Sequence, residues 1–269
     1  MKIAFIGDIV GSPGRAMIKE HVSKLKREFS IDLVIANGEN ASHGFGLTQK
    51  NAKELFASGV DMITGGNHTW DRKEIIPLFD TMPILRPLNY PEGVEGKGVG
   101  FLHVGDESLA VINAMGHFSM PMVENPFIAL KGCVQKLRND GIKNILIDFH
   151  AESTAEKRAL HMLLKGQVSA IMGTHTHIGT DDLSVQEGTC YVSDVGMSGC
   201  RDNVIGMEAQ APLKRFLTGL PASLDVPKKC KKIFQMVVMT LEDGLCKEAF
   251  KVRIYEGAEE MFIQKAFYE

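Results

Sequence analysis

Gly173-Thr174-His175-Thr176-His177 directly follows an apolar run at residues 168–172, which we expect to form a buried strand. Side chains two residues apart lie on one face of a strand, and the same spacing in a turn lets two imidazoles reach adjacent points. The glycine is expected to supply the backbone freedom for a turn at this strand end. This arrangement of imidazoles suits a metal, so further ligands must come from elsewhere in the chain.

Outward from this stretch, short apolar runs alternate with amphipathic segments, a pattern typical of an α/β protein. The expected strands are residues 3–6, 33–36, 62–64, 99–104, 109–113, 144–149 and 168–172. The expected helices are residues 15–29, 48–58, 71–79, 126–139 and 155–164. The end of the chain is expected to be mostly β, at residues 190–192, 233–241 and 250–255.

The composition indicates a chain that can bury a substantial core. It has 269 residues, of which 44% are hydrophobic, and no internal repeat or linker, so we expect one domain spanning residues 1–269. The formal net charge of -3 offers no attraction for duplex nucleic acid, whereas a small nucleotide remains a suitable partner for a local pocket. No segment reaches the ~18 apolar residues of a membrane span, so no membrane partner is expected. The oligomeric state is left open, a homo-oligomer included.

The cysteines and the beginning of the chain bear on the cellular compartment. The five cysteines are odd in number and form no CxxC pair, which argues for reduced thiols and against a disulfide framework. The apolar run that begins at Ile3 is too short for a signal peptide and ends in Asp8. Both observations favour a cytoplasmic protein.

Polar residues follow five of the expected strands, each within three positions of the strand end. They are Asp8, Glu39, Asn67, His150 and His175, with Asn40, His68 and His177 beside them. Taken singly, a lone Asp here is usually a turn or cap residue, and a lone His is usually a satisfied hydrogen-bonding group. Their joint occurrence is better explained by one sheet edge that collects them, where open α/β sheets place their ligands.

The chemistry of these side chains suits two metal ions. Carboxylate, carboxamide and imidazole groups favour iron, manganese or zinc, and the absence of cysteine beside them disfavours a structural zinc site. Glu39 can bridge, with one carboxylate oxygen to each ion. Two ions about 3.5–4 Å apart can hold a hydroxide and bind both nonbridging oxygens of a phosphate group, which suits in-line attack on phosphorus.

The motif series resembles that of the calcineurin-like metallophosphoesterases, which carry Asp-x-His, Gly-Asp-x-x-Asp, Gly-Asn-His, a solitary His and Gly-His-x-His. Gly66-Asn67-His68, His150 and Gly173-Thr174-His175-Thr176-His177 match the last three motifs. Asp8 lacks a histidine two positions later, and Gly38-Glu39-Asn40 replaces the second motif. These departures resemble the YmdB-type branch over nearly the whole chain. The resemblance implies an α/β fold, a layered sandwich of two mixed β-sheets flanked by helices.

The same resemblance implies roles for individual residues. Asp8, Glu39, Asn40 and His177 would hold the first metal ion, and Glu39, Asn67, His150 and His175 the second. The branch is similar to 2',3'-cyclic-nucleotide 2'-phosphodiesterases, with two divalent or mixed-valence ions, iron being the expected metal and manganese or zinc the alternatives. His68 is carried over as the proton donor to the leaving oxygen. We therefore expect metal-hydroxide attack on a cyclic phosphodiester, opposite the 2' oxygen, to yield a 3'-nucleotide.

Two other functions are compatible with the sequence. The same metals could serve a broader phosphomonoesterase or nucleotidase, and a non-catalytic regulatory protein could keep metal for structure. The complete ligand series together with His68 favours catalysis, since a structural site needs neither an open coordination position nor an acid. The physiological metal, the base preference, the pathway and the roles of His43 and His117 are left open.

Overall fold

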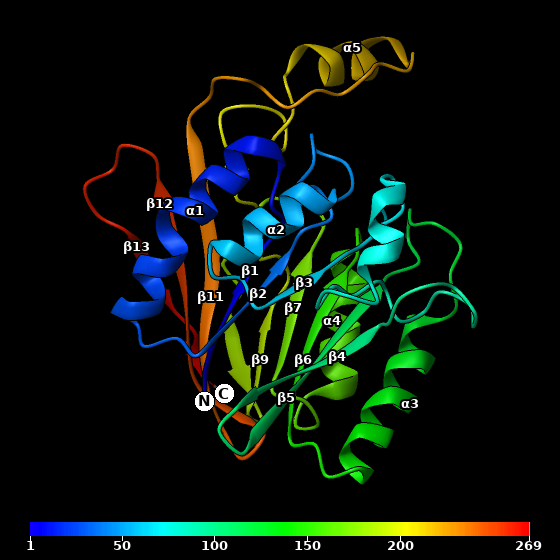
Figure 1. Ribbon diagram of the computed structural model, residues 1–269, viewed down its shortest axis with the longest axis vertical. Helices are drawn as coiled ribbons and strands as arrows, with labels where there is room; N and C mark the ends of the chain where they lie inside the picture. The colour runs from blue at the N-terminus through cyan, green and yellow to red at the C-terminus, as the bar shows by residue number, and fades with distance from the viewer. Residues whose placement is uncertain (269) are drawn as a thin grey trace.

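Two mixed β-sheets packed face to face form the centre of the protein, and helices cover their outer faces (Figure 1). The computed structural model describes residues 1–268. In spatial order the first sheet has β13 (Phe262–Lys265), β12 (Leu245–Tyr255), β11 (Lys232–Glu242), β1 (Lys2–Ile6), β2 (Leu33–Asn37) and β3 (Met62–Thr64), with β10 (Gly199–Cys200) paired to β11. The second has β14 (Phe267–Tyr268), β8 (Ser184–Gln186), β9 (Thr189–Val192), β7 (Ala170–Thr174), β6 (Asn144–His150), β5 (Glu107–Met115) and β4 (Val99–Val104). The expected layered α/β sandwich is confirmed.

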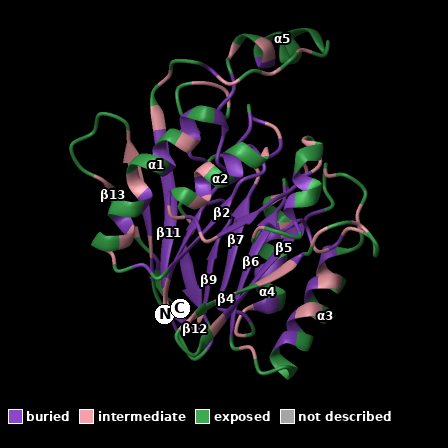
Figure 2. Ribbon diagram, in the orientation of Figure 1, coloured by how far each residue is buried: buried purple, intermediate pink, exposed green. Residues whose placement is uncertain are grey.

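The central strands of both sheets are almost wholly buried (Figure 2), whereas the edge strands β4, β13 and β14 are partly exposed. Alternate side chains of a buried strand enter different layers. Ile3 and Phe5 of β1 pack between the two sheets, whereas Ala4 and Ile6 pack against the helices of the first sheet. This alternation follows from the two-residue repeat of a strand. The helices over the first sheet are α1 (Gly11–Glu28) and α2 (Gln49–Ala57), and those over the second are α3 (Pro126–Asn139) and α4 (Thr154–Leu164).

Parallel strand pairs decide where the polar strand ends lie. In the first sheet β1, β2 and β3 run parallel, and in the second β5, β6, β7 and β9 do so. The carboxyl ends of parallel neighbours meet at one edge, where open α/β sheets bind their ligands. The loops after β1, β2 and β3 of the first sheet and after β6 and β7 of the second carry the residues singled out in the sequence to a common region. The expectation that a single sheet edge collects these residues was wrong, because the edges of two packed sheets contribute them.

Three local expectations differ from the structure. Instead of an α-helix at residues 71–79, the chain forms a 3-10 helix, Lys73–Leu78, because Pro77 lies within it and cannot donate a main-chain hydrogen bond. Gly173 lies inside β7 and not in a turn, and a side chain there would overlap the main-chain oxygen of Ser193, so close packing requires the glycine. A further helix, α5 (Gln210–Thr218), was not expected at all.

The cysteine prediction was wrong for two of the five residues. Cys200 and Cys230 form a disulfide with their Cα atoms 5.6 Å apart, whereas Cys133, Cys190 and Cys246 are free thiols. The sequence could not reveal the pair because 30 residues separate the two cysteines, and only the β10–β11 pairing brings them together. Within residues 1–268, no helix has both the length and the apolar character needed to traverse a bilayer.

Candidate metal centre

His150, at the carboxyl end of β6, is the centre of the first group of polar side chains. Its Nε2 lies 3.0 Å from Glu39 Oε1, 2.9 Å from Asn67 Oδ1 and 3.1 Å from His175 Nδ1. Its Nδ1 lies 2.9 Å from Thr174 Oγ1 on the opposite side of the ring. Glu39, His150 and His175 each direct one ligand atom to a common point where they could hold a metal ion.

A second group lies beside the first and shares Glu39 with it. His177 Nε2 is 3.2 Å from Asn40 Nδ2 and 3.7 Å from Asp8 Oδ1. Asn40 Nδ2 in turn donates a hydrogen bond of 3.3 Å to Glu39 Oε1. His177 Nδ1 lies 2.8 Å from the main-chain oxygen of Ile205, and donation to that oxygen leaves the Nε2 lone pair free for a ligand.

The charges of this centre are arranged for a cation. Burial by itself would raise the pKa of Glu39, but the neighbouring positive charge and hydrogen bond of His150 lower it to about 2. Burial raises the pKa of Asp8, whose Oδ1 is buried without a hydrogen-bond partner. Burial, together with the charge of His150, lowers the pKa of His175 to about 3, so this imidazole is neutral, as a metal ligand must be. The orphaned oxygen and the ligand chemistry therefore fit a metal ion.

The histidine loop is held in an uncommon backbone conformation. His175 and His177 have φ angles of 99° and 65°, in the region that side chains other than glycine rarely adopt. Asp8 Oδ2 accepts the main-chain N–H of His175 at 3.1 Å. Asp194 Oδ2 accepts the main-chain N–H and the hydroxyl of Thr176 at 3.0 and 2.7 Å. These contacts turn both imidazoles toward the polar groups of the other sheet.

His68 lies at the side of the centre, with its ring directed by its neighbours. Its main-chain N–H donates to Glu39 Oε2 at 2.9 Å, and its Nδ1 lies 2.8 Å from Asp71 Oδ2. The ring of Phe45 packs edge-to-face against it, with centroids 4.9 Å apart. Donation from Nδ1 to the carboxylate leaves Nε2 for a group in the adjoining cavity.

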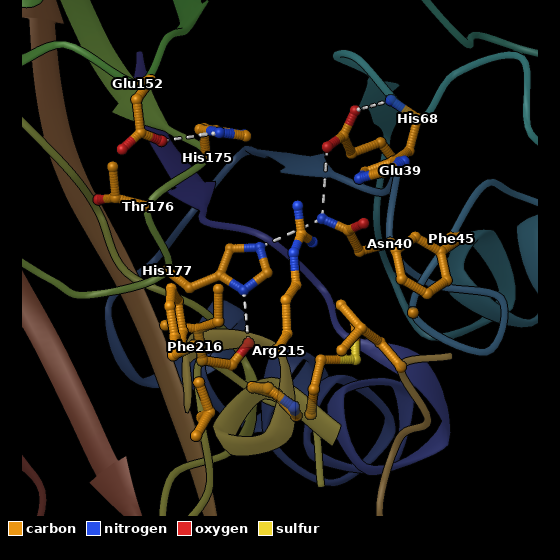
Figure 3. A pocket seen from close by; sticks show the side chains of 16 residues that line it. Glu39, Asn40, Phe45, His68, Glu152, His175, Thr176, His177, Arg215 and Phe216 are labelled. Atoms are coloured by element: carbon orange, nitrogen blue, oxygen red, sulfur yellow. Dashed lines mark hydrogen bonds and ion pairs between the residues drawn. The ribbon is translucent and has the colours of Figure 1, made fainter. Parts of the chain in front are cut away.

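A cavity of about 380 Å³ opens over these side chains (Figure 3). Glu39, Asn40, His68, His175 and His177 line its polar side, and its opposite side is apolar. His43 and His117 are exposed, and neither is among the described residues that line this cavity.

Sequence reasoning missed several residues of the centre. Asp71 supports His68, and Glu152 Oε2 lies 3.0 Å from His175 Nε2, so both carboxylates orient a histidine. Their positions three residues after His68 and two after His150 were the available signals. Gly66 was matched only as part of a motif, yet a side chain there would overlap the ring of His150 and the carboxylate of Glu39. Arg215 was missed because the helix that carries it was not expected.

The protein has paired mixed sheets and a buried carboxylate at the strand ends that contacts one imidazole and one amide. These features define the class of the metallophosphoesterases. Within that class, the family model of the YmdB-like proteins matches residues 4–252. The chain belongs to the YmdB-like protein family.

Three relatives illustrate the extent of the similarity. The chain is 44% identical over 267 residues to the 2',3'-cyclic-nucleotide 2'-phosphodiesterase of Bacillus subtilis, a match that covers 98% of this chain and 100% of that one. The crystal structure of a novel phosphatase from Mycoplasma pneumoniae has a TM-score of 0.90 at 33% identity, covering 95% of this chain and 93% of that one. A hypothetical protein from Thermus thermophilus has a TM-score of 0.88 at 37% identity, covering 99% of this chain and 100% of that one.

Proposed function

We propose that this protein hydrolyses 2',3'-cyclic nucleotides to 3'-nucleotides with the help of two metal ions. The observation that carries the proposal is the position of Glu39, which contacts both His150 of one group and Asn40 of the other. A carboxylate in contact with two groups of candidate ligands is what a bridged metal pair requires. The 44% identity to the Bacillus subtilis phosphodiesterase supports the substrate class.

The ligand sets follow the two groups. Asp8, Glu39, Asn40 and His177 would hold one ion, and Glu39, Asn67, His150 and His175 the other. Asn40 would turn its amide over to present the carbonyl oxygen. When bound, the metals supply Lewis-acid activation of the phosphate and of the attacking water. We propose iron as the metal, with manganese or zinc as alternatives, because the mixed nitrogen and oxygen donors suit all three.

His68 is proposed as the proton donor in the reaction. Water attacks phosphorus and the bond from phosphorus to the 2' oxygen breaks. The leaving 2' oxygen takes a proton from His68 Nε2, and the proton lost by the attacking water then restores the one that His68 gave up. Asp71, 2.8 Å from Nδ1, keeps the ring in the orientation that places Nε2 on the cavity side. His68→Ala should lower kcat by 100-fold or more, a magnitude of order 10²–10⁴ for general-acid catalysis, with metal content unchanged. Full turnover by this variant would remove His68 from the reaction.

A product-resolved chromatographic assay tests the function. Purified, iron- or manganese-loaded protein is incubated with 2',3'-cyclic AMP beside Glu39→Gln and the surface control Glu20→Gln, whose side chain is 70% exposed. We expect 3'-AMP from the wild type and the control only, and a lower metal content in Glu39→Gln. Equal metal content and rate in all three would refute the bridging role. Absence of turnover in a wild type with two bound metals would refute the cyclic-nucleotide substrate.

A second candidate is phosphomonoester hydrolysis. It is favoured by the description of the Mycoplasma pneumoniae relative as a phosphatase. The same assay distinguishes the two activities, because a phosphomonoesterase would convert 3'-AMP further to adenosine. A stable 3'-AMP product would exclude this activity, and metal binding without either reaction would favour the regulatory alternative.

The wider context is also proposed. Both sheets contribute to one core between them, which includes Phe5 of β1 and Val111 of β5, and this supports a single domain over residues 1–269. A nucleotide substrate supports a cytoplasmic location. In a reducing cytoplasm, cellular thiols would attack the Cys200–Cys230 disulfide. Alkylation of the protein in intact cells therefore tests the compartment, because Cys200 and Cys230 react with the reagent only where their disulfide has been reduced.

A further inference from the structure

The segment between Cys200 and Cys230 lies outside the sheet core and forms one wall of the cavity. The disulfide joins its ends, and α5 within it stands away from both sheets (Figure 1). Of the nine residues of α5, only Pro212 is buried. The main-chain oxygen of Ile205 ties the segment to His177 at 2.8 Å. A helix with so little buried surface contributes little to the core, so its position over the cavity calls for another explanation.

Arg215 gives this wall a positive charge. It is the only Lys or Arg among the described residues that line the cavity. Its side chain points toward Asn40 and His177 (Figure 3), and no hydrogen bond or ion pair engages it within residues 1–268. A guanidinium with free donors beside a proposed metal pair is suited to an anion that the metals also attract.

The same wall carries an apolar surface next to Arg215. Its members are Val204, Ile205, Met207, Phe216 and Leu224, and Phe45, which lies outside this segment, lines the same cavity. Phe216 is 81% exposed, although it borders the cavity. Large exposed apolar side chains around a hollow are typical of a ligand site, and a cavity of about 380 Å³ falls in the size range of small-molecule sites.

We propose that this wall recognises the two ends of a nucleotide, with Arg215 binding the phosphate and the apolar surface at Phe216 receiving the base. The base-binding part rests on the proposed function, because it assumes that the substrate is a nucleotide. The phosphate-binding part rests on the free guanidinium and its place in the cavity beside the metal centre, and it does not require that the substrate be a cyclic nucleotide. Arg215 thus adds a substrate-binding residue that lies outside the strand-end motifs.

Calorimetric titration of the manganese-loaded protein with inorganic phosphate and with 3'-AMP tests both halves without requiring turnover. Arg215→Ala should lower the affinity for both ligands roughly 10- to 100-fold, the size expected for a lost charge-assisted hydrogen bond. Lys214→Ala is the matched control, because Lys214 is exposed on the same helix but does not line the cavity. Unchanged phosphate binding in Arg215→Ala would overturn the assignment, and so would an equal loss in the lysine variant.

Phe216→Ala tests the base surface. This substitution should lower the affinity for 3'-AMP roughly 5- to 100-fold, as expected for the loss of a base–aromatic contact, and leave the affinity for inorganic phosphate unchanged. Leu217→Ala is the control, since Leu217 is 83% exposed and is not among the residues lining the cavity. An equal loss for both ligands in Phe216→Ala would contradict base recognition, as would wild-type binding of 3'-AMP in that variant.

The cyclic AMP assay separates this inference from the proposed function. If the wild type does not hydrolyse 2',3'-cyclic AMP while Arg215→Ala binds inorganic phosphate more weakly than the wild type, the proposed function fails and the role of Arg215 stands. If the wild type hydrolyses the substrate and Arg215→Ala binds phosphate normally, the function stands and Arg215 is excluded. A wild type that binds neither ligand with its metals present overturns the inference.

Discussion

Replacing Asp194 with asparagine should destabilise the whole protein and loosen the histidine loop. The Asp194 carboxylate is 1% exposed and accepts four hydrogen bonds, three at Oδ2 and one at Oδ1. Three come from main-chain and hydroxyl groups of Thr176 and Gly196, and the fourth from Lys157 Nζ at 3.0 Å. The Lys157 side chain is also 1% exposed, so the charge pair is shielded from water.

The magnitude follows from what each substitution leaves behind. Asp194→Asn leaves the Lys157 ammonium buried without a carboxylate, which costs about 3–5 kcal/mol in the free energy of unfolding. Lys157→Met leaves the carboxylate with its three neutral donors and should cost less, about 1–3 kcal/mol. The double variant should lose less than the sum of the two single losses, because it leaves neither charge alone. Since Thr176 lies between His175 and His177, Asp194→Asn should also lower metal content.

Urea unfolding at pH 7, with metal analysis of each preparation, measures these effects. The four proteins form a double-mutant cycle whose coupling energy reports the buried pair. Additive losses, or a loss below about 1 kcal/mol for Asp194→Asn, would refute the reasoning that this carboxylate neutralises a buried charge and holds the loop.

Three further predictions concern other parts of the molecule. Gly66→Ala should lower metal content, because its methyl group would overlap a carboxylate and an imidazole of the centre, whereas Gly132→Ala, whose new methyl meets no atom within 4 Å, should bind metal normally and stabilise by about 0.5–1 kcal/mol. Burial lowers the pKa of Lys251 to about 8, so the unfolded chain binds more protons above that pH and this group adds stability as pH rises. The stability advantage of Lys251→Met over the wild type should therefore shrink by roughly 2–3 kcal/mol between pH 7 and 10, and a constant difference in urea unfolding would contradict the depressed pKa. Replacing Cys200 and Cys230 by serine should lower the free energy of unfolding by about 3.5 kcal/mol, given their separation of 30 residues. An unchanged midpoint of urea unfolding would mean that strand pairing alone holds the ends together.

Local patterns in the sequence were sufficient for much of the fold. The alternation of apolar runs with helical periodicity predicted the strands that precede Asp8, Glu39 and His150, because side-chain period follows directly from backbone geometry. Parallel neighbours end at the same edge, so the polar residues after strands of one sheet could be expected to converge, whereas the meeting of Glu39 with His150 required the packing of two sheets. The distances around Glu39 show that these residues converge.

Other features were beyond local patterns. Helix α5 was missed although Leu213, Phe216 and Leu217 have helical spacing and Gly219 follows, since the segment buries too little apolar surface to stand out. The Cys200–Cys230 disulfide was missed because no sequence pattern near Cys200 indicates a partner 30 residues away.

The amino-acid sequence by itself determined the order of the elements and the kinds of ligand placed at the strand ends, because both depend on neighbouring residues. Only the tertiary structure decided that Lys157 neutralises Asp194 and that Arg215 points into the cavity. These contacts join residues far apart along the chain. Their geometry is the outcome of packing two sheets and their loops together, which no short stretch of sequence encodes.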